Sequence, residues 1–566
     1  MKNQVYNIIL ILFILIISGC EDFLDEKPVA EETIDSFLND PSIPLEDRFE
    51  NMMNAAYSVY YISERSWQNN KHYFENMIPN FLSDDHQKGG DGDSDFPEML
   101  DMCLWSHITT NTTGSHYTTP WLVGYLGVSR ANLILGLLED NKDRLDSKVY
   151  DKSKGECLFI RGYFYFLLAK TYGGVPYFEE TVLPENYFDQ PRLSTEELYQ
   201  KITDDFTEAI SLLPEKSGLD IQNWGGRATK GAARAILARV HTMEVAFKFN
   251  GRSWNDVYNL TKAIKNSGEY SLLDNFAEVF ESEGEMGSES VFEIPCADLG
   301  GVYGSSGGYM EGRMITPRVQ TGLTYGNNYQ QAAGWGFSTP TQDLFNEFDP
   351  GDFRRECSMI ANGDIYLGEV TPIVVDAQCP SGYWQRKYAG KVVRNNTSGA
   401  ENWRIVRYAE VLLTHAEAAY HISEFGEAFS ALNEVHERAM NSTGPKGSVL
   451  GVGSIMDGIP FTYPTETSTL AALDPALNGE ALLNAIKHER RVELVSEGIR
   501  FYDLVRWDEY EDAIKRKIPE DYFLKNNDPE QVIDNYRSHL LDGKVPVMPI
   551  PVDEVETFGI EQNPGY

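Results

Sequence analysis

Apolar residues recur at helical spacing through most of the chain. Between residues 121 and 139, Trp121, Tyr125, Val128 and Asn132 follow one another in steps of three or four, which is typical of one face of an amphipathic helix. Residues 153–172 are rich in aromatic side chains and stop at Gly173-Gly174, as helices often do. Further helices are predicted over residues 46–62, 195–212, 227–248 and 480–507. The pattern therefore predicts a mostly α-helical protein.

Two stretches predict helices that pack closely in pairs. In 227–248, Ala228, Ala232, Ala235 and Ala238 form a stripe of small residues, which lets a second helix approach. Residues 402–440 contain two helical patterns separated by a turn at Glu424-Phe425-Gly426. Together they have about the length of one TPR repeat of roughly 34 residues. We therefore expect several TPR-like helical hairpins.

Two long segments lack this periodicity. Residues 83–120 contain Asp84-Asp85, a Gly- and Asp-rich run and Trp105, whereas residues 297–340 are rich in Gly, Tyr and Thr. Such composition indicates irregular loops with short strands. Long irregular segments in an otherwise regular protein are where binding tends to occur.

The N-terminus has the features of a lipoprotein signal. Lys2 precedes an unbroken apolar run, Ile8–Ile17, which is shorter than the about 20 residues that span a bilayer and suits a secretory signal. The run ends at Ile17-Ser18-Gly19-Cys20, where small residues before a cysteine suit lipoprotein signal peptidase. We predict lipidation of Cys20 after removal of residues 1–19; the alternative is an ordinary signal cleaved near Gly19.

Composition narrows the class of partner. The chain has 86 acidic against 48 basic residues, so nucleic acid is not an expected partner, because phosphate binding needs clustered Lys and Arg. Besides Cys20 there are five scattered cysteines, which is neither a disulfide scaffold nor a zinc pattern. Cys157 lies in an apolar helical stretch and is predicted to be a core residue. Whether Cys357 and Cys379 form a disulfide bond is left open, because an oxidising cell exterior would permit one.

Several motifs, taken together and in order, resemble the SusD/RagB family of outer-membrane glycan-binding lipoproteins. The N-terminal half has Trp121-x3-Tyr125, residues 155–162 (GECLFIRG), Tyr172-Gly173-Gly174-Val175-Pro176 and residues 226–233 (GRATKGAA). The C-terminal half has residues 407–413 (RYAEVLL), 489–494 (ERRVEL), 503–507 (DLVRW) and the closing 562–566 (QNPGY). Cys157 stands where the family usually has alanine.

The resemblance implies a SusD-like helical fold, with an N-terminal region over 20–275 and a C-terminal region over 276–566 that carries a ligand-binding segment, 297–340. It implies a surface lipoprotein, anchored to the outer membrane and facing the cell exterior, that hands its ligand to a SusC-type TonB-dependent transporter. Glu21 and Asp22, which follow the predicted lipidated cysteine, resemble the family's surface-export signal.

The arginine and glutamate residues of the motifs are interpreted as structural. Arg490, Arg491, Glu493, Glu497 and Arg500 lie at helical spacing, so we expect them to pair with one another in a packing and ion-pair network. The same interpretation holds for Arg161, Arg407 and Glu410.

The two irregular segments carry the residue types that glycan binding needs. Sugars require flat apolar faces for their C–H surfaces and planar polar groups for their hydroxyls. The predicted glycan-binding residues are Asp84, Asp85, Trp105, Tyr303, Tyr325, Tyr329 and Trp335, with Asn327 and Asn328 also available for hydroxyls. We expect at least two of the aromatic residues to line the site. On this basis, Trp105→Ala and Trp335→Ala should weaken glycan retention without lowering thermal stability.

Catalytic interpretations are weaker. Gly304-Ser305-Ser306-Gly307-Gly308 matches GxSxG, but the strand and helix that flank a nucleophile elbow are not evident. No HExxH, P-loop or dinucleotide fingerprint is found, and no carboxylate pair of a glycosidase stands out. Asp91-x-Asp93-x-Asp95 lacks the Gly and Glu of a calcium loop. We predict a non-enzymatic glycan-binding protein without cofactor or metal; a surface glycoside hydrolase and a peptide-binding relative remain the alternatives.

Overall fold

The structure is a computed structural model and describes residues 34–61, 73–106, 115–182, 184–220, 225–296, 314–315, 334–366, 368–371, 373–388, 402–450 and 461–566. The chain divides into two units, residues 1–52 and 53–566. In the first unit, α2 (Ile34–Leu38) is joined to the start of α3 (Leu45–Tyr57). The Arg48 side chain donates to the carbonyls of Leu38 and Ile43 and so closes the turn between them.

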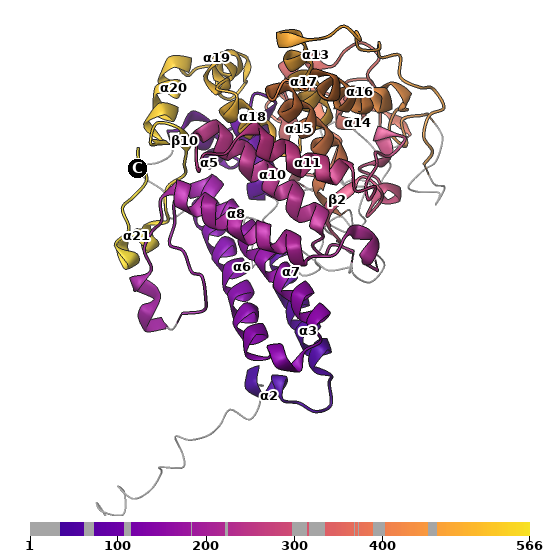
Figure 1. The fold of residues 1–566 in the computed structure, drawn as a ribbon. Coiled ribbons are helices and arrows are strands. Elements are labelled where there is room, and N and C mark those ends of the chain that lie inside the picture. The colour runs from indigo at the N-terminus through magenta and orange to yellow at the C-terminus, as the bar shows by residue number, and fades with distance from the viewer. Residues whose placement is uncertain are drawn as a thin grey trace, which may run out of the picture. The chain divides into compact units, whose positions relative to one another are not determined.

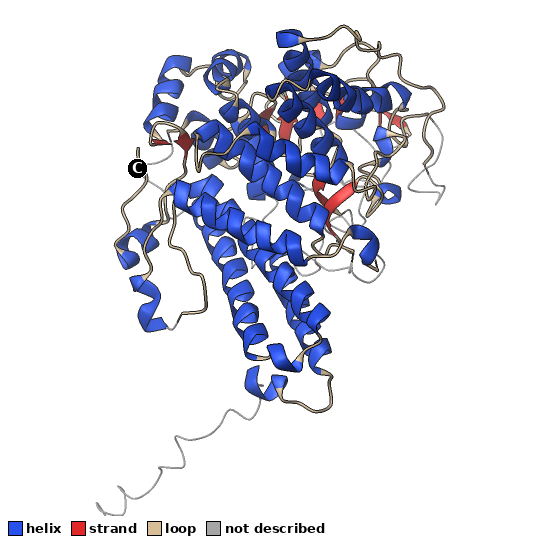
Figure 2. Ribbon diagram, in the orientation of Figure 1, coloured by secondary structure: helices blue, strands red, loops and turns tan. Residues whose placement is uncertain are grey.

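The second unit is built on a series of helices in which each packs against the next (Figures 1 and 2). The series runs through α6 (Ser115–Asp140), α7 (Ser147–Tyr172), α8 (Thr195–Leu212), α10 (Lys230–Phe247), α11 (Trp254–Lys265), α15 (Tyr408–His421) and α16 (Phe425–Asn441). The sequence-based prediction of a mostly helical fold with TPR-like hairpins is therefore confirmed.

Local chemistry explains why these helices begin and pack where they do. Ser194 and Glu197 form a reciprocal capping box at the start of α8, which satisfies two exposed backbone donors. The predicted alanine stripe of α10 is buried throughout, with Ala232 fully covered. Gly127 of α6 lies so close to α7 that a Cβ there would be 2.0 Å from the Phe164 ring. Small residues thus set the spacing between neighbouring helices.

Helix α6 is apolar along much of its length. Residues Tyr117–Asp140 are long and apolar enough to cross a membrane by composition, but half of the apolar window is buried inside the protein. Gly124 and Gly127 lie against Leu168 and Phe164 of α7. The helix is therefore a core helix on its α7 side.

The predicted helix over 480–507 is wrong in one respect. The structure has two helices, α17 (Gly479–Glu493) and α18 (Arg500–Arg506), separated by a sharp turn. Ser496 and Gly498 in this turn have φ of 64° and 72°, and that left-handed conformation interrupts a helix. The charged helical pattern continues across the break, so periodicity alone did not reveal it.

Short antiparallel pairs of strands complete the fold (Figure 2). They are β1 (His86–Gly89) with β3 (Phe337–Pro340), β2 (Ser290–Ile294) with β8 (Trp403–Arg407), β4 (Met359–Ala361) with β7 (Tyr383–Gln385), β5 (Ile365–Tyr366) with β6 (Glu369–Val370), and β9 (Leu540–Leu541) with β10 (Val545–Pro546). The β1–β3 pair joins the two segments that were predicted to be irregular. Residues 83–120 are more regular than predicted, because they also contain α5 (Pro97–Leu104) and the start of α6.

The remaining helices cover the series and its strands. They are α4 (Ile78–Leu82), α13 (Gln342–Glu347), α14 (Arg354–Ser358), α19 (Tyr510–Glu520), α20 (Pro529–Ser538) and α21 (Val552–Phe558). Cys157 is fully buried, as predicted. Cys357 and Cys379, left open as a pair, are free thiols.

Candidate functional site

Trp105 is a core residue. It ends α5 in a left-handed conformation with φ 50° and is 1% exposed. Its indole Nε1 donates to the Tyr510 hydroxyl at 2.9 Å, and the Tyr536 ring meets it edge-on at 5.2 Å between centroids. No face of the indole is accessible to a sugar, so Trp105 is not part of the candidate site.

Asp84 and Asp85 are also buried, next to arginines. Asp84 accepts from Arg500 Nε at 2.9 Å and Asp85 accepts from Arg491 Nε at 2.9 Å. Burial alone would raise the pKa of Asp84, but Arg491, Arg500 and Arg516 together hold it well below its usual range. Burial, with the neighbouring Asp84 charge, raises the pKa of Asp85 to about 6. The two carboxylates therefore attach the segment before β1 to α17 and α18 rather than face solvent.

The structural interpretation of the arginine and glutamate motifs is confirmed, but their partners differ from those predicted. Glu493 accepts from Arg354, Arg407 and Arg438, which come from three other elements of the fold. Arg490 pairs with Asp503 at 3.0 Å. Glu493 therefore binds elements that lie 55 to 139 residues away along the chain, while Arg491 and Arg500 reach the N-terminal half through Asp85 and Asp84.

The motif residues of the other helices behave in the same way. Arg161 of α7 forms a two-pronged pair with Asp205 of α8, at 2.9 and 2.6 Å. Glu410 of α15 accepts from Arg239 of α10. These pairs connect α7 to α8 and α10 to α15.

Trp335 is the one predicted aromatic residue that the described part of the chain places at a partly exposed position. It lies between Gly334 and Gly336, directly before β3. Gly336 has φ 68°, and its carbonyl accepts from the Gly90 N–H at 2.8 Å. The β1–β3 pairing therefore fixes the backbone on which the indole stands.

Three loops lie next to one another beside the β1–β3 pair, and we call residues 90–96, 334–336 and 373–383 the loop surface. The Gln378 side chain donates to Asp91 at 2.7 Å, and the Phe96 and Phe337 rings are in edge contact at 5.5 Å. Val374 and Val375 are 52% and 66% exposed. These two valines and the partly exposed Trp335 place apolar side chains at the solvent boundary of the loop surface.

The other predicted residues lie outside the described residues. These are Cys20, Tyr303, Tyr325 and Tyr329, together with Asn327 and Asn328 and the GxSxG match at 304–308. Their roles stay predictions. No group of three or more His, Cys, Asp or Glu side chains that could hold a metal is found among the described residues.

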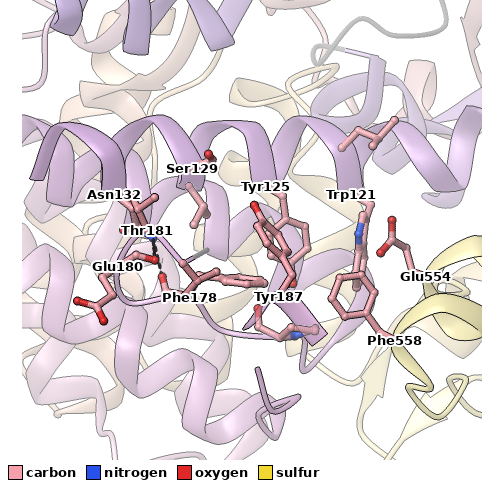
Figure 3. A pocket seen from close by; sticks show the side chains of 14 residues that line it. Trp121, Tyr125, Ser129, Asn132, Phe178, Glu180, Thr181, Tyr187, Glu554 and Phe558 are labelled. Atoms are coloured by element: carbon pink, nitrogen blue, oxygen red, sulfur yellow. Dashed lines mark hydrogen bonds between the residues drawn. The ribbon is translucent and has the colours of Figure 1, made fainter. Parts of the chain in front are cut away.

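A second site is an open aromatic pocket that sequence reasoning did not identify (Figure 3). It has a volume of about 280 Å³ and is formed by α6, the segment 176–187 and α21. Its lining consists of Trp121, Leu122, Tyr125, Val128, Ser129, Asn132, Pro176, Phe178, Glu180, Thr181, Val182, Tyr187, Glu554 and Phe558.

The predicted stripe of α6 forms one wall of this pocket. In Figure 3, Trp121, Tyr125, Ser129 and Asn132 extend from α6 toward the pocket. The Tyr125 hydroxyl donates to the Pro176 carbonyl at 2.7 Å, and the Asn132 amide donates to the Phe178 carbonyl at 2.8 Å. These bonds hold the segment 176–187 beside the helix.

One feature of the sequence could have indicated the pocket. Leu122, next to Trp121, is 62% exposed, so α6 carries apolar side chains on more than the face that packs against α7. An amphipathic helix has charged or polar residues there instead.

Two family models match consecutive stretches of the chain. The model described as "SusD family" matches residues 288–566, and the one described as "Starch-binding associating with outer membrane" matches residues 22–242. Among curated relatives, SusD-like protein P2 of Formosa agariphila is 26% identical over 99% of this chain and 99% of the relative. SusD-like protein P25 of the same organism is 24% identical over 89% of this chain and 90% of the relative.

Solved structures share the fold. Surface glycan-binding protein A from Bacteroides fluxus matches 92% of this chain and 99% of its own, with a TM-score of 0.68 and 24% identity. The protein of that name from Bacteroides thetaiotaomicron, in complex with laminarihexaose, matches 92% and 99% with a TM-score of 0.67 and 22% identity. A SusD homologue from the latter organism matches 94% and 99% with a TM-score of 0.73 and 20% identity. With both halves matched by family models and the fold shared over nearly its whole length, this chain belongs to the SusD family.

Proposed function

We propose that the protein is a non-catalytic surface lipoprotein that captures an oligosaccharide or polysaccharide and delivers it to a SusC-type TonB-dependent transporter. The observation that carries the proposal is the match of both halves of the chain to this family. Two proteins with the same fold are surface glycan-binding proteins, one of them in complex with laminarihexaose, and this supports the choice of ligand.

We place the glycan on the loop surface, with Trp335 as the stacking residue. The β1–β3 pairing holds the backbone next to Trp335. The loss of conformational entropy when a sugar binds is therefore small, and such preorganisation favours affinity. The predicted residues Tyr303, Tyr325 and Tyr329 belong to the segment that leads into β3. We include them in the proposed site on sequence grounds.

Anchoring through Cys20 would keep the site at the outer membrane, next to the transporter. A single acyl chain binds a membrane only marginally, so stable attachment needs more than one. Metabolic labelling with a palmitate analogue tests this step: the wild-type chain should be labelled and Cys20→Ala should not. Label that persists in Cys20→Ala would contradict the proposed anchor.

The ligand site is tested by affinity electrophoresis through gels that contain single polysaccharides, with laminarin among them because one protein of the same fold is a laminarin-binding SusD-like protein. We expect one polysaccharide to retard the protein and Trp335→Ala to lose most of that retardation. Trp254→Ala is the matched control, since Trp254 is also partly exposed and lies away from the loop surface, on α11, where its ring stacks on His421 of α15. Equal retardation of wild type and Trp335→Ala would show that the site is placed wrongly.

A surface polysaccharide-degrading enzyme and a peptide-binding relative are the competing functions. Release of new reducing ends that one carboxylate substitution abolishes would establish the enzyme. Retention on peptide but on no glycan would establish the peptide carrier. The transporter step is tested by purification of the tagged chain from native outer membranes, where a TonB-dependent transporter should co-purify in a stoichiometric amount.

A further inference from the structure

The open aromatic pocket shares no residue with the loop surface. We propose that it is a second carbohydrate site, which binds one neutral sugar ring and rejects anionic sugars. This inference rests on the proposed glycan-binding function, but it concerns a different site, formed by different elements.

The size of the pocket limits the ligand to something small. Its volume is about 280 Å³, just below the range of roughly 300–1,000 Å³ that holds drug-sized ligands. One sugar ring, or the end of a longer chain, is of the right order. The side that faces solvent is open, so the rest of a chain could extend outward from it.

Aromatic faces supply the apolar contact. Trp121 lies at one end of the pocket beside Phe558 (Figure 3) and is only 4% exposed. Tyr187 is 39% exposed and Phe558 is partly exposed, so these two rings offer most of the accessible aromatic surface, and Trp121 reports on it from below. The Phe188 ring packs on Phe558 at 5.0 Å between centroids and so supports it from outside. The negative face of an aromatic ring attracts polarised C–H groups, which line the faces of a sugar ring.

The polar groups decide which sugar is accepted. Glu554 lies at the Trp121 end and Glu180 at the Asn132 end (Figure 3). Both carboxylates can accept hydrogen bonds from hydroxyl groups. None of the described residues that line the pocket is a lysine or an arginine.

The same carboxylates repel a uronic acid or a sugar sulfate. Half-burial raises the pKa of Glu554, with the neighbouring Asp553 charge as a further cause, and a second negative charge would meet the same penalty. Repulsion of this kind is a common source of specificity. The pocket therefore selects neutral sugars by charge and not by the shape of the ring alone.

The experiment uses full-length protein labelled with 5-fluorotryptophan and fluorine NMR. Trp121→Phe and Trp335→Phe assign two of the nine tryptophan signals, so the pocket and the loop surface are read separately. The probes are a panel of neutral methyl glycosides (gluco, galacto, manno, xylo and fuco) and glucuronic acid. We expect at least one neutral glycoside to shift the Trp121 signal saturably and glucuronic acid to leave it unchanged.

Variants show whether the sugar occupies the pocket. Phe558→Ala and Tyr187→Ala should each weaken the Trp121 response by about tenfold, as the loss of a stacking anchor does. Phe425→Ala is the control, because Phe425 is similarly exposed, at 42%, on α16. The double variant Glu180→Gln/Glu554→Gln should gain a response to glucuronic acid.

Several results would overturn the inference. They are no Trp121 shift with any neutral glycoside, an unchanged response in Phe558→Ala and Tyr187→Ala, or binding of glucuronic acid equal to that of its neutral counterpart. A Trp121 shift with the tripeptide Lys-Trp-Lys but with no glycoside would replace the sugar with a basic protein segment. Failure of the Trp335 signal to respond concerns the proposed function and leaves the pocket result readable.

Discussion

The largest stability effect that we expect from a single polar substitution is that of Glu493→Gln. The Glu493 carboxylate is fully buried at the end of α17. It accepts from Arg354 at 3.1 Å, Arg407 at 3.0 Å and Arg438 at 2.5 Å. Burial alone would raise the pKa of Glu493, but these arginines hold it well below its usual range. Glutamine keeps the shape of the side chain and removes the charge that the three guanidinium groups share.

The size of the loss in stability depends on which carboxylate partners the three arginines keep after the substitution. Removing one partner of a buried ion pair costs about 3–5 kcal/mol. Arg354 keeps Asp352 and Glu489, and Arg407 keeps Glu289 and Glu497. Arg438 keeps Glu289, so no arginine is left without a carboxylate and the lower end of that range applies. We expect the free energy of unfolding to fall by about 3 kcal/mol.

Denaturant unfolding followed by circular dichroism measures this change. The control is Glu530→Gln, because Glu530 is 65% exposed in its pair with Lys515, and exposed pairs contribute about 0–1 kcal/mol. A midpoint for Glu493→Gln that equals that of Glu530→Gln would refute the reasoning. A second change, Arg438→Met, should recover part of the loss if an unbalanced buried charge is its cause.

Three further predictions concern the core and pH. Trp105→Ala should lower the free energy of unfolding by about 3–5 kcal/mol, because the indole is 1% exposed; a melting temperature equal to that of wild type would contradict its core position. Gly498→Ala should cost about 2 kcal/mol or more, since φ is +72° and a Cβ would lie 2.3 Å from the Glu75 carbonyl oxygen; unchanged unfolding would argue against this turn. Arg354 and His436 outweigh burial and lower the pKa of Glu489 to about 2, so its stabilisation is present above pH 4.5 and is lost as the pH falls toward 2. Unfolding midpoints measured from pH 6 to 2 should fall more steeply for wild type than for Glu489→Gln, and parallel curves would contradict this assignment.

The helices could be predicted from the sequence because their signals are local. The predicted range 195–212 coincides with α8, and the predicted 153–172 ends where α7 ends. The Ser194 capping box and the left-handed Gly173 after α7 are contained in short stretches of sequence. The break between α17 and α18 was missed because Ser496 adopts a left-handed conformation that its residue type does not demand.

The placement of Trp105 could not be predicted because burial depends on residues far away. Trp105 follows a Gly- and Asp-rich run and looks like a loop residue, yet Tyr510 and Tyr536 enclose it. The partners of the arginine motifs are equally distant: Arg491 binds Asp85, which lies 406 residues earlier in the chain. Helical spacing predicted that these arginines pair with residues of the same helix, whereas in the structure their partners lie on other elements.

The sequence indicated two of the three loops of the loop surface, but neither the third loop, 373–383, nor the aromatic pocket. Trp335 was identified by composition, and the structure adds the β1–β3 pairing that holds it. The pocket forms only where α21 and the segment 176–187 lie beside α6. The residue pattern of a single helix does not reveal that these segments pack together. The division into regions at residues 275 and 276 stays a prediction.

The central claim is that the protein binds glycan without cleaving it. The most direct measurement incubates the purified protein with each polysaccharide of a panel and records, from the same sample, the amount bound and the reducing ends released. We predict saturable binding of at least one polysaccharide, a loss of that binding in Trp335→Ala, and no reducing ends above those of the polysaccharide alone. Reducing ends that increase with time and protein concentration, or binding to no polysaccharide at all, would contradict the account.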